Sequence, residues 1–458
     1  MDSKKLLRLT PVSLLVLISC VSSNPAGTNT VEPLDIGGTT PEASGLVRVI
    51  TAADRSAHPP EPIATPFKVV HHFASIAPIP AGDASNDPNS GGTDSSGTSG
   101  ASGTSSTTAT PSPTPSPTPS PGGGGTSSDT AGVKTFAGST PGFLNGTGTG
   151  AQFNGPVALA IDANKNIYVA DTANNCIRKI DTLGNVITFA GDSNASGFLN
   201  AQGTSAKFNA PTGLAFDASG NLYVADSGNN CIRKIDASGN VTTFANTAGT
   251  QGAQNGAVAS ATFNQPYGIA FYAPTSTFYV SDAGGNLIRA IASGTVSTLA
   301  GDGTAGYKES QSGGGSDAEF NHPEGLAVGQ DASGTVNVYV ADTNNGALRV
   351  VSTQGGVTTS LQGAPGQDQL GHPGGVAIFD HYAFVAATKN EQIREFDTKA
   401  PVLPTFQNKL VAGGNTAGMT DGPLTSALFD DPAGIATIAS GTLYVVDKTS
   451  SRVRKVSF

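Results

Sequence analysis

The chain has 458 residues and a net charge of −10; only 13% of its residues are charged, while 59 are glycine. Nucleic-acid binding depends on lysine and arginine contacts to phosphate, so an acidic chain without a basic stripe excludes nucleic acid as a partner. The glycine content favours a turn-rich all-β protein over a helical one. Tryptophan is absent, so a bound sugar would have to stack on tyrosine or phenylalanine.

The amino terminus has the features of an export signal. Three basic residues, Lys4, Lys5 and Arg8, precede an apolar run over residues 9–18. A run of about ten residues is too short for the ~20 that cross a bilayer as a helix, but it fits the core of a signal peptide. We therefore expect residues 1–19 to be a signal peptide.

The residues that end this run resemble the bacterial lipobox, because Ser19 places a small side chain directly before Cys20. The resemblance implies that Cys20 is lipidated and becomes the first residue of the mature chain. Several acyl chains, at ~0.8 kcal/mol per buried methylene, would then hold the protein on a membrane. Val21 stands where an aspartate would favour the inner membrane, so we expect the outer membrane or the cell surface. Ordinary secretion with cleavage nearby is the alternative.

Two segments without a regular pattern follow the signal. Residues 20–83 contain scattered apolar runs between prolines, and we expect them to be largely irregular. Residues 84–130 are mostly Ser, Thr, Gly and Pro, and such a composition cannot bury enough apolar surface to fold. Within them, residues 111–121 alternate proline with serine or threonine, which favours extended polyproline II. This segment is predicted to be a disordered linker that holds residues 131–458 away from the membrane.

Residues 131–458 contain six copies of one pattern, whose prolines are spaced by 55, 55, 57, 50 and 59 residues. The prolines are Pro156, Pro211, Pro266, Pro323, Pro373 and Pro432. A large apolar residue lies three positions before each proline, and an arginine follows downstream. The residue seven before each arginine is aspartate in five copies, and Ala387 is the exception. Repeats of this length, built from short strands, indicate a propeller or solenoid, because one unit cannot bury its own apolar face.

Each copy predicts four short antiparallel strands. In the second copy these are residues 213–217, 221–226, 232–235 and 241–245, separated by turn sequences. Four such strands form one propeller blade. The sixth copy lacks its fourth strand, and residues 133–138, which match residues 186–191, are expected to supply it. The predicted fold class is therefore all-β, a six-bladed β-propeller closed by an N-terminal strand.

The pattern Phe-x-x-Pro-x-Gly-(Leu/Ile/Val)-Ala, followed by Tyr-Val-Ala-Asp and Asn-x-(Ile/Leu)-Arg, resembles the NHL repeat. The fifth copy departs most, since residues 384–388 read Phe-Val-Ala-Ala-Thr. The resemblance implies a six-bladed propeller. NHL propellers include binding modules, a copper- or zinc-assisted amidating lyase and relatives near the metal-dependent lactonases, so the resemblance does not decide the activity.

The strand order predicts where a site would lie. The loops before each proline and the turns between the second and third strands share one rim, and the residue after each proline lies near the channel mouth. The residues after the prolines are Val157, Thr212, Tyr267, Glu324, Gly374 and Ala433. Tyr267 and Glu324 carry the strongest chemistry, and two histidines directly precede their prolines on adjacent blades. The candidate binding residues are therefore Tyr267, Glu324, His322, His372 and Thr212.

Residues that recur once in each copy are interpreted as framework. The repeated aspartates are expected to accept backbone N–H groups in the following turn and to pair with the repeated arginines. Cys176 and Cys231 occupy equivalent positions in successive copies, which should exceed the ~7 Å Cα limit for a disulfide. We interpret them as buried thiols, with a disulfide or a metal pair as the alternative.

No complete catalytic or metal-ligand set is present in the sequence. A lyase-type zinc site would need a third histidine beside His322 and His372, and only Glu324 fits a lactonase-like ring of carboxylates and amides. We therefore predict no cofactor and expect a monomeric binding head that recognises an extracellular protein or glycan and touches the membrane through its anchor alone. An exported metal-dependent hydrolase or lyase, with calcium or zinc held in the channel by these three residues, is the alternative. A purely structural role in the envelope is the third possibility.

Overall fold

The computed structural model describes residues 131–311, 313–331, 333–359, 370–398, 408–439 and 441–458. The expected signal peptide, the lipidation site at Cys20 and the segments 20–83 and 84–130 lie outside the described residues. In the part of the chain that is described, helices are too short and too polar to cross a membrane.

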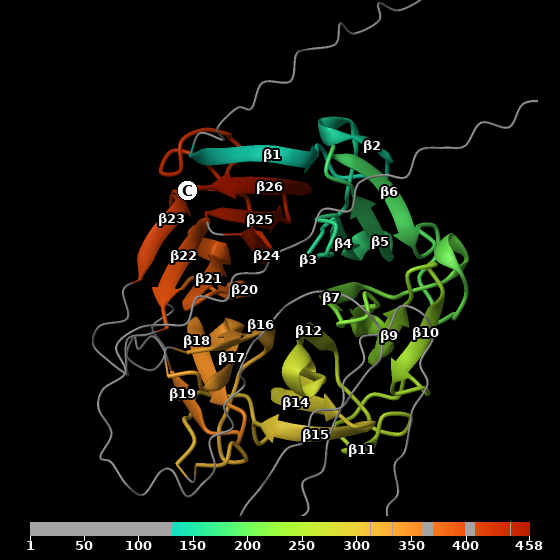
Figure 1. Ribbon diagram of the computed structural model, residues 1–458, viewed down its shortest axis with the longest axis vertical. Coiled ribbons are helices and arrows are strands. Elements are labelled where there is room, and N and C mark those ends of the chain that lie inside the picture. The colour runs from blue at the N-terminus through green and yellow to red at the C-terminus, as the bar shows by residue number, and fades with distance from the viewer. Residues whose placement is uncertain (1–130, 312, 332, 360–369, 399–407, 440) are drawn as a thin grey trace, which may run out of the picture. The chain divides into compact units, whose positions relative to one another are not determined.

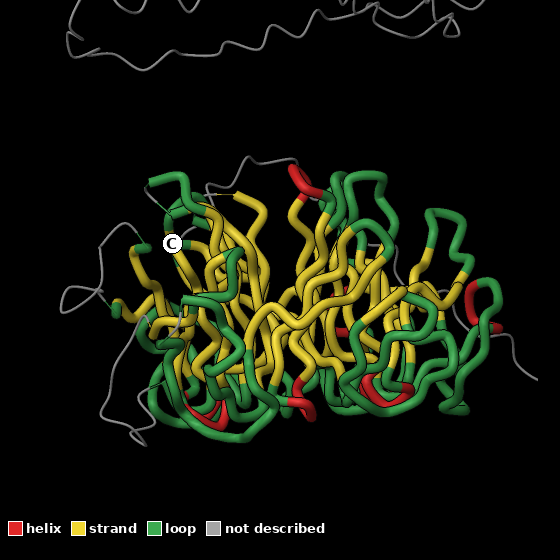
Figure 2. Tube along the Cα trace, turned by 90° about the horizontal axis from the view of Figure 1, so that it is seen from below, coloured by secondary structure: helices red, strands yellow, loops and turns green. Residues whose placement is uncertain are grey.

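Six antiparallel sheets stand around a common centre and form a six-bladed β-propeller (Figure 1). The predicted all-β, six-bladed fold class is confirmed. In every blade the first three strands of the repeat follow one another in chain order from the centre outwards, so the first strand of each repeat faces the central channel. The side view shows the strands running between two faces, with loops on both (Figure 2).

Each of the first three blades contains the four strands that the repeat predicts. The first blade consists of β3 (Ala158–Ile161), β4 (Ile167–Asp171), β5 (Cys176–Ile180) and β6 (Asn185–Ala190), extended by β2 (Gly146–Thr147). The second consists of β7 (Pro211–Phe216), β8 (Leu222–Asp226), β9 (Cys231–Ile235) and β10 (Val241–Ala245). The third consists of β12 (Pro266–Tyr272), β13 (Thr277–Asp282), β14 (Leu287–Ala292) and β15 (Thr295–Ala300), extended by β11 (Gly256–Ala257).

The last three blades follow the same order. The fourth consists of β16 (Pro323–Gln330), β17 (Val336–Asp342), β18 (Ala347–Ser352) and β19 (Val357–Thr359). The fifth consists of β20 (Pro373–Phe379), β21 (Tyr382–Ala387), β22 (Gln392–Asp397) and β23 (Lys409–Gly413). The sixth consists of β24 (Pro432–Ala439), β25 (Thr442–Asp447), β26 (Arg452–Ser457) and β1 (Gly132–Gly138), which is its outer strand although it comes first in the chain.

Short 3-10 helices occupy several of the turns. Five of them join the second and third strands of a blade, and each is followed by a residue in the left-handed conformation: η3 (Thr172–Asn174), η5 (Ser227–Asn229), η7 (Ala283–Gly285), η8 (Thr343–Asn345) and η9 (Thr388–Asn390). The others lie elsewhere in the loops: η2 (Gly148–Gly150), η4 (Gly203–Ser205) and η6 (Ala273–Thr275).

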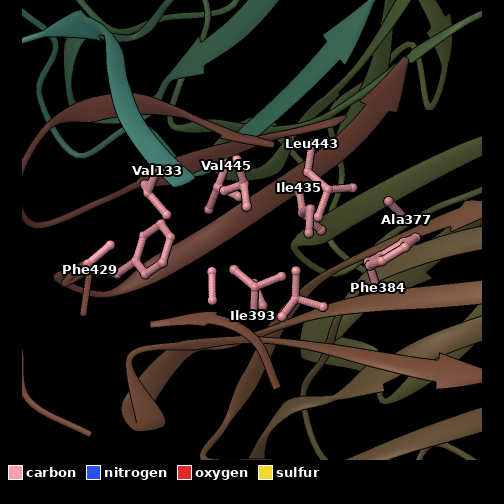
Figure 3. Packing of buried hydrophobic residues seen from close by; sticks show 13 residues of the cluster. Val133, Ala377, Phe384, Ile393, Phe429, Ile435, Leu443 and Val445 are labelled. Carbon is pink, nitrogen blue, oxygen red and sulfur yellow. The ribbon is translucent and has the colours of Figure 1, made fainter. Parts of the chain in front are cut away.

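The hydrophobic core lies mainly between neighbouring blades. In one cluster, Phe384 and Ile393 of the fifth blade pack against Ile435, Leu443 and Val445 of the sixth (Figure 3). Five further clusters fill the spaces around the rest of the ring. Each blade therefore buries its faces against its neighbours, as expected for a repeat unit that cannot form a core alone.

Five buried ion pairs each join an aspartate at the end of a blade's second strand to an arginine in its third strand. They join Asp171 to Arg178, Asp226 to Arg233, Asp282 to Arg289, Asp342 to Arg349 and Asp447 to Arg454, with N···O distances of 2.7–2.9 Å and no solvent exposure. In the second blade, Asp226 also accepts hydrogen bonds from the backbone N–H of Asn209 and from Asn229 Nδ2. Burial raises the pKa of Asp226, but these two donors and Arg233 stabilise its ionised form. The interpretation of the recurring Asp and Arg as framework is confirmed.

The remaining sequence features of the framework agree with the structure. Cys176 and Cys231 are free and buried, and burial raises the pKa of both thiols. In the fifth blade, where Ala387 replaces the aspartate, Arg394 is partly exposed and contacts Gln392 Oε1 at 2.8 Å and Asn408 Oδ1 at 3.2 Å instead.

Candidate binding site at the channel mouth

A narrow channel runs between the innermost strands of the six blades and encloses about 120 Å³. The third residue after each proline is aliphatic and lines the wall: Leu159, Leu214, Ile269, Leu326, Val376 and Ile435. The second residue is glycine in five blades, and Ala158 is the exception. Ligand pockets for drug-sized molecules usually measure about 300–1,000 Å³, so this channel admits only a slender group.

The glycines of the wall allow the innermost strands to approach one another closely. A Cβ atom at Gly213 would collide with the carbonyl oxygen of Tyr267 in the next blade, and one at Gly268 would collide with that of Glu324. The same holds at Gly325 and Gly375. Only glycine fits at such an approach. The close packing brings the variable residues that follow the prolines together at one end of the channel.

The residue before each proline has a left-handed backbone. The φ values are 54° for Gly155, 49° for Ala210, 53° for Gln265, 54° for His322, 51° for His372 and 66° for Asp431. This conformation is unfavourable for residues other than glycine, so it needs support from neighbouring groups. In four blades the backbone N–H donates to a side chain of the preceding blade: Ala210 to Asn175, Gln265 to Asn230, His322 to Asn286 and Asp431 to Glu391. These four hydrogen bonds therefore link neighbouring blades at the rim.

Three of the five predicted site residues come together at this end of the channel. His322 Nδ1 lies 3.3 Å from Glu324 Oε1, and the His322 ring meets the Tyr267 ring edge-on with 6.4 Å between the centroids. Burial raises the pKa of Tyr267 well above its usual value, and the charges of Glu324 and Asp431 raise it further. A hydrogen bond to Glu324 raises the pKa of His322. We define Tyr267, His322, Glu324 and Asp431 as the mouth cluster.

Asp431 and its neighbour Glu391 are missing from the residues predicted from sequence. Asp431 Oδ2 lies 3.4 Å from Lys448 Nζ, and the backbone N–H of Asp431 donates to Glu391 Oε2 over 2.8 Å. Burial raises the pKa of Glu391, and the charges of Asp430, Asp431 and Asp447 add to this shift. Because Asp431 precedes its proline as His322 and His372 do, the sequence contained the signal that would have found it.

The other two predicted residues lie at the same end but make different contacts. His372 Nε2 lies 2.7 Å from Lys389 Nζ. Thr212 is buried, with 5% of the residue exposed, and its hydroxyl donates to the backbone oxygen of Tyr267 over 2.9 Å. Thr212 therefore joins the second blade to the third. The binding roles of His372 and Thr212 stay predictions.

Charge is unevenly distributed over this rim. Among the described residues before and after the prolines, and in the turns between second and third strands, the first three blades carry only uncharged side chains. The last three carry all the charged ones and both histidines: His322, Glu324, His372, Lys389, Glu391, Asp430, Asp431 and Lys448. Four carboxylates against two lysines make this half of the rim negative when the histidines are neutral.

A metal centre is not apparent at the mouth. Among the described residues, no group of three or more His, Cys, Asp or Glu side chains lies close enough to hold a metal ion. His322 and Glu324 are engaged with each other, and His372 faces Lys389. The arrangement can donate and accept hydrogen bonds and can attract positive charge.

Comparison with known proteins identifies the repeat. The NHL repeat matches residues 153–180 and 208–235. SUPPRESSOR OF QUENCHING 1, a chloroplastic protein of Arabidopsis thaliana, is 29% identical over 328 residues, which cover 66% of this chain and 30% of that protein. NHL repeat-containing protein 2 of Bos taurus is 27% identical over 335 residues, which cover 62% of this chain and 45% of that protein. The chain thus spans less than half the length of these two relatives.

A solved structure supports the fold. An auxiliary nutrient binding protein from Bacteroides thetaiotaomicron is 14% identical and has a TM-score of 0.52, over 72% of this chain and 76% of that one. At this level of identity the similarity concerns the fold alone.

Proposed function

Because the chain carries NHL repeats in a six-bladed propeller, we propose that it is a binding module whose ligand contacts the channel mouth. The observation that supports this most strongly is the convergence of Tyr267, His322 and Glu324, which differ from the equivalent residues of the other blades. The recurring aspartates and arginines form buried ion pairs in five of the six blades, so specificity is proposed to come from the positions where the blades differ.

The proposed partner is an extracellular protein or a glycan, and the proposed location is a bacterial outer membrane or cell surface. Export and a lipid anchor are proposed because residues 1–19 resemble a lipoprotein signal peptide that directly precedes Cys20. In this proposal the Ser/Thr/Gly/Pro-rich segment 84–130 separates the propeller from the membrane. The head is proposed to act as a monomer.

The location is tested by fractionation of cells that express the full-length chain. The Cys20→Ala substitution removes the atom that would carry the lipid, and it should move the protein from the membrane to the soluble fraction. Cys176→Ala is the matched control, because this cysteine is buried in the propeller. Membrane association that survives Cys20→Ala would contradict the anchor.

The binding role is tested with the purified full-length chain on arrays of glycans and of extracellular proteins. Tyr267→Ala combined with Glu324→Gln should abolish any binding that uses the mouth. Asp236→Asn is the control, because Asp236 is a partly exposed carboxylate in the turn between the outer strands of the second blade, and an asparagine Oδ1 can still accept from the backbone N–H groups of Ser238 and Asn240. Binding that is unaffected by the mouth substitutions would refute the assignment.

Metal analysis separates binding from the hydrolase or lyase alternative. The binding proposal expects neither zinc nor calcium in stoichiometric amount in the purified chain. Stoichiometric metal that is lost on Glu324→Ala would instead favour the enzyme.

A further inference from the structure

We propose that the propeller opens locally at its fifth blade. In each blade we define the entry segment as the four residues that end with the proline of the repeat. The entry segments are residues 153–156, 208–211, 263–266, 320–323, 370–373 and 429–432. The entry segment of the fifth blade separates from the propeller while the other five stay closed. It leads directly into Gly374, Gly375 and Val376 of the channel wall, so its opening widens the channel at one blade.

A buried aspartate holds the entry segment in five blades. Its Oδ1 atom accepts the backbone N–H of the second residue of the segment over 2.6–2.8 Å. The donors and acceptors are Asn154 and Asp171, Asn209 and Asp226, Asn264 and Asp282, Asn321 and Asp342, and Asp430 and Asp447. In the fifth blade Ala387 stands at the position of the aspartate, so its side chain cannot accept this hydrogen bond.

The arginine of each buried ion pair makes a second connection. In the same five blades its Nη1 atom donates to the backbone oxygen of the residue directly before the entry segment, over 2.9–3.0 Å. In the fifth blade the equivalent arginine, Arg394, donates to the side chains of Gln392 and Asn408 instead. Among the described residues, Arg394 therefore makes no hydrogen bond that holds the entry segment.

The preceding blade provides a third connection at four of the six positions. The residue after the turn between its second and third strands accepts the backbone N–H of the third residue of the next entry segment. These acceptors are Asn175, Asn230, Asn286 and Glu391. Before the fifth blade this position is Gly346, which has no side chain, and before the first blade it is Ser451, but the first blade keeps Asp171. In the described part of the chain, the fifth blade is thus the one that lacks both the aspartate and the acceptor from its neighbour.

Backbone hydrogen bonds and packing keep the fifth entry segment closed most of the time. The Lys389 N–H donates to the Gly371 oxygen over 2.7 Å, and the Leu370 N–H donates to the Gly346 oxygen over 3.3 Å. Leu370 is also fully buried. The free energy of local opening falls as the number of such contacts falls, so this segment opens more often than its equivalents. The inference concerns the scaffold, and it holds whichever ligand the mouth receives.

Hydrogen–deuterium exchange of the purified full-length chain, resolved to single amides, measures the opening. Lys389 in the fifth blade, Ala173 in the first and Asn344 in the fourth each donate to the backbone oxygen of the second residue of their entry segment. The Lys389 bond is 2.7 Å long and the other two are 3.1 Å, so bond length does not favour exchange at Lys389. After correction for intrinsic rates, Lys389 should exchange at least about tenfold faster, because a hydrogen bond to a charged group changes an equilibrium by about that factor or more. Equal corrected rates would overturn the inference.

Two substitutions restore the missing acceptors. Ala387→Asp should slow the exchange of Lys389 at least about tenfold and leave that of Ala173 unchanged. Gly346→Asn should slow it by about twofold to tenfold. The φ of Gly346 is 61°, close to the 52–54° of the three equivalent asparagines, so the backbone accepts this change. If neither variant slows the exchange of Lys389, or if all amides slow equally, local opening at the fifth blade is wrong.

The second blade provides the reciprocal test, which does not depend on how Ala387→Asp folds. Asp226→Ala removes the aspartate that holds its entry segment. The Gly228 N–H donates to the Asn209 oxygen and corresponds to that of Lys389. Its exchange should become at least about tenfold faster relative to Ala173. An equal acceleration at both amides would show global unfolding and would contradict the role given to the aspartate.

A cysteine in the channel tests whether the opening reaches the wall. Val376→Cys places a thiol among the lining residues of the fifth blade. Its reaction with methyl methanethiolsulfonate, above the background of the unsubstituted chain, should slow when Ala387→Asp or Gly346→Asn is added, by the same factor as the exchange of Lys389. A reaction rate that neither substitution changes would refute the widening of the channel.

Discussion

The Asp226→Ala substitution tests one of the five buried ion pairs of the framework. Asp226 accepts three hydrogen bonds of 2.8–2.9 Å, from the Asn209 backbone, Asn229 and Arg233. Its loss leaves the guanidinium of Arg233 buried without a counter-charge and removes the acceptor of a backbone N–H. Removal of one partner from a buried ion pair typically lowers stability by about 3–5 kcal/mol. We expect a loss in that range.

The fifth blade supplies a natural control. Arg394 is the equivalent arginine, but it is partly exposed and has no aspartate partner among the described residues. Arg394→Ala removes hydrogen bonds to two neutral side chains, so we expect a loss of only about 0.5–1.5 kcal/mol for each bond. The difference between the losses of unfolding free energy in Asp226→Ala and Arg394→Ala reports the contribution of the buried charge.

The assay is urea denaturation followed by tyrosine fluorescence and far-UV circular dichroism, since the chain has no tryptophan. A third variant, Asp226→Ala with Arg233→Met, removes the uncompensated charge and should recover part of the lost stability. The reasoning is refuted if Asp226→Ala lowers stability by less than about 1 kcal/mol. It is also refuted if Arg394→Ala has an equal effect, or if the double variant is as unstable as the sum of its parts.

Three further predictions concern the rim and the channel wall. Gly325→Ala should lower the free energy of unfolding by at least about 1–3 kcal/mol, because the added Cβ would collide with a carbonyl of the next blade. Ala158→Gly, at the equivalent position of the first blade, should change the free energy of unfolding far less. Equal urea midpoints for the two variants would contradict this prediction. Ser451 has a buried hydroxyl without a hydrogen-bond partner among the described residues. The first three blades have an asparagine at the equivalent position, which accepts a hydrogen bond from the residue before the next proline. Ser451→Asn should therefore stabilise the fold by about 0.5–1.5 kcal/mol, and a lower urea midpoint would disprove it. Glu324 raises the pKa of His322. While Glu324 is ionised, the stabilisation from this pair is complete below the ordinary pKa of histidine and is lost as pH rises through the raised pKa. An NMR titration of His322 should show a midpoint that falls in Glu324→Gln, and an unchanged midpoint would exclude the pairing.

Much of the fold could be predicted because the sequence repeat corresponds directly to the structural unit, the blade. Prolines at regular spacing, alternating apolar residues and turn sequences predict four strands per blade, and six copies predict six blades. The buried aspartates and arginines were recognisable as framework, because a residue that recurs in nearly every copy is expected to stabilise the blade structure that all the copies share. These signals are local in sequence, so no tertiary information was needed to interpret them.

The site could be predicted only in part. Tyr267, His322 and Glu324 lie within sixty residues of one another and flank equivalent prolines. The predicted strand order was therefore sufficient to place all three at the same rim of the propeller. Asp431 directly precedes a proline and could have been found by the same rule, but its effect on Tyr267 joins the third and sixth blades and could not be read from the sequence. Thr212 also follows a proline, yet its hydroxyl is directed to the next blade, and no sequence pattern encodes that choice.

The pairing of β1 with β26 has a consequence for how the protein forms. These strands are the first and last of the described chain, and Val133 lies opposite Val456. Contacts between residues so far apart in sequence form slowly, because the loop between them must first be ordered. β1 leaves the ribosome long before its partner is made, so it must remain unpaired until the whole chain has emerged. We expect closure of the ring to be the last step of folding, and an unclosed chain, with two free strand edges, to be the species most prone to aggregation during synthesis.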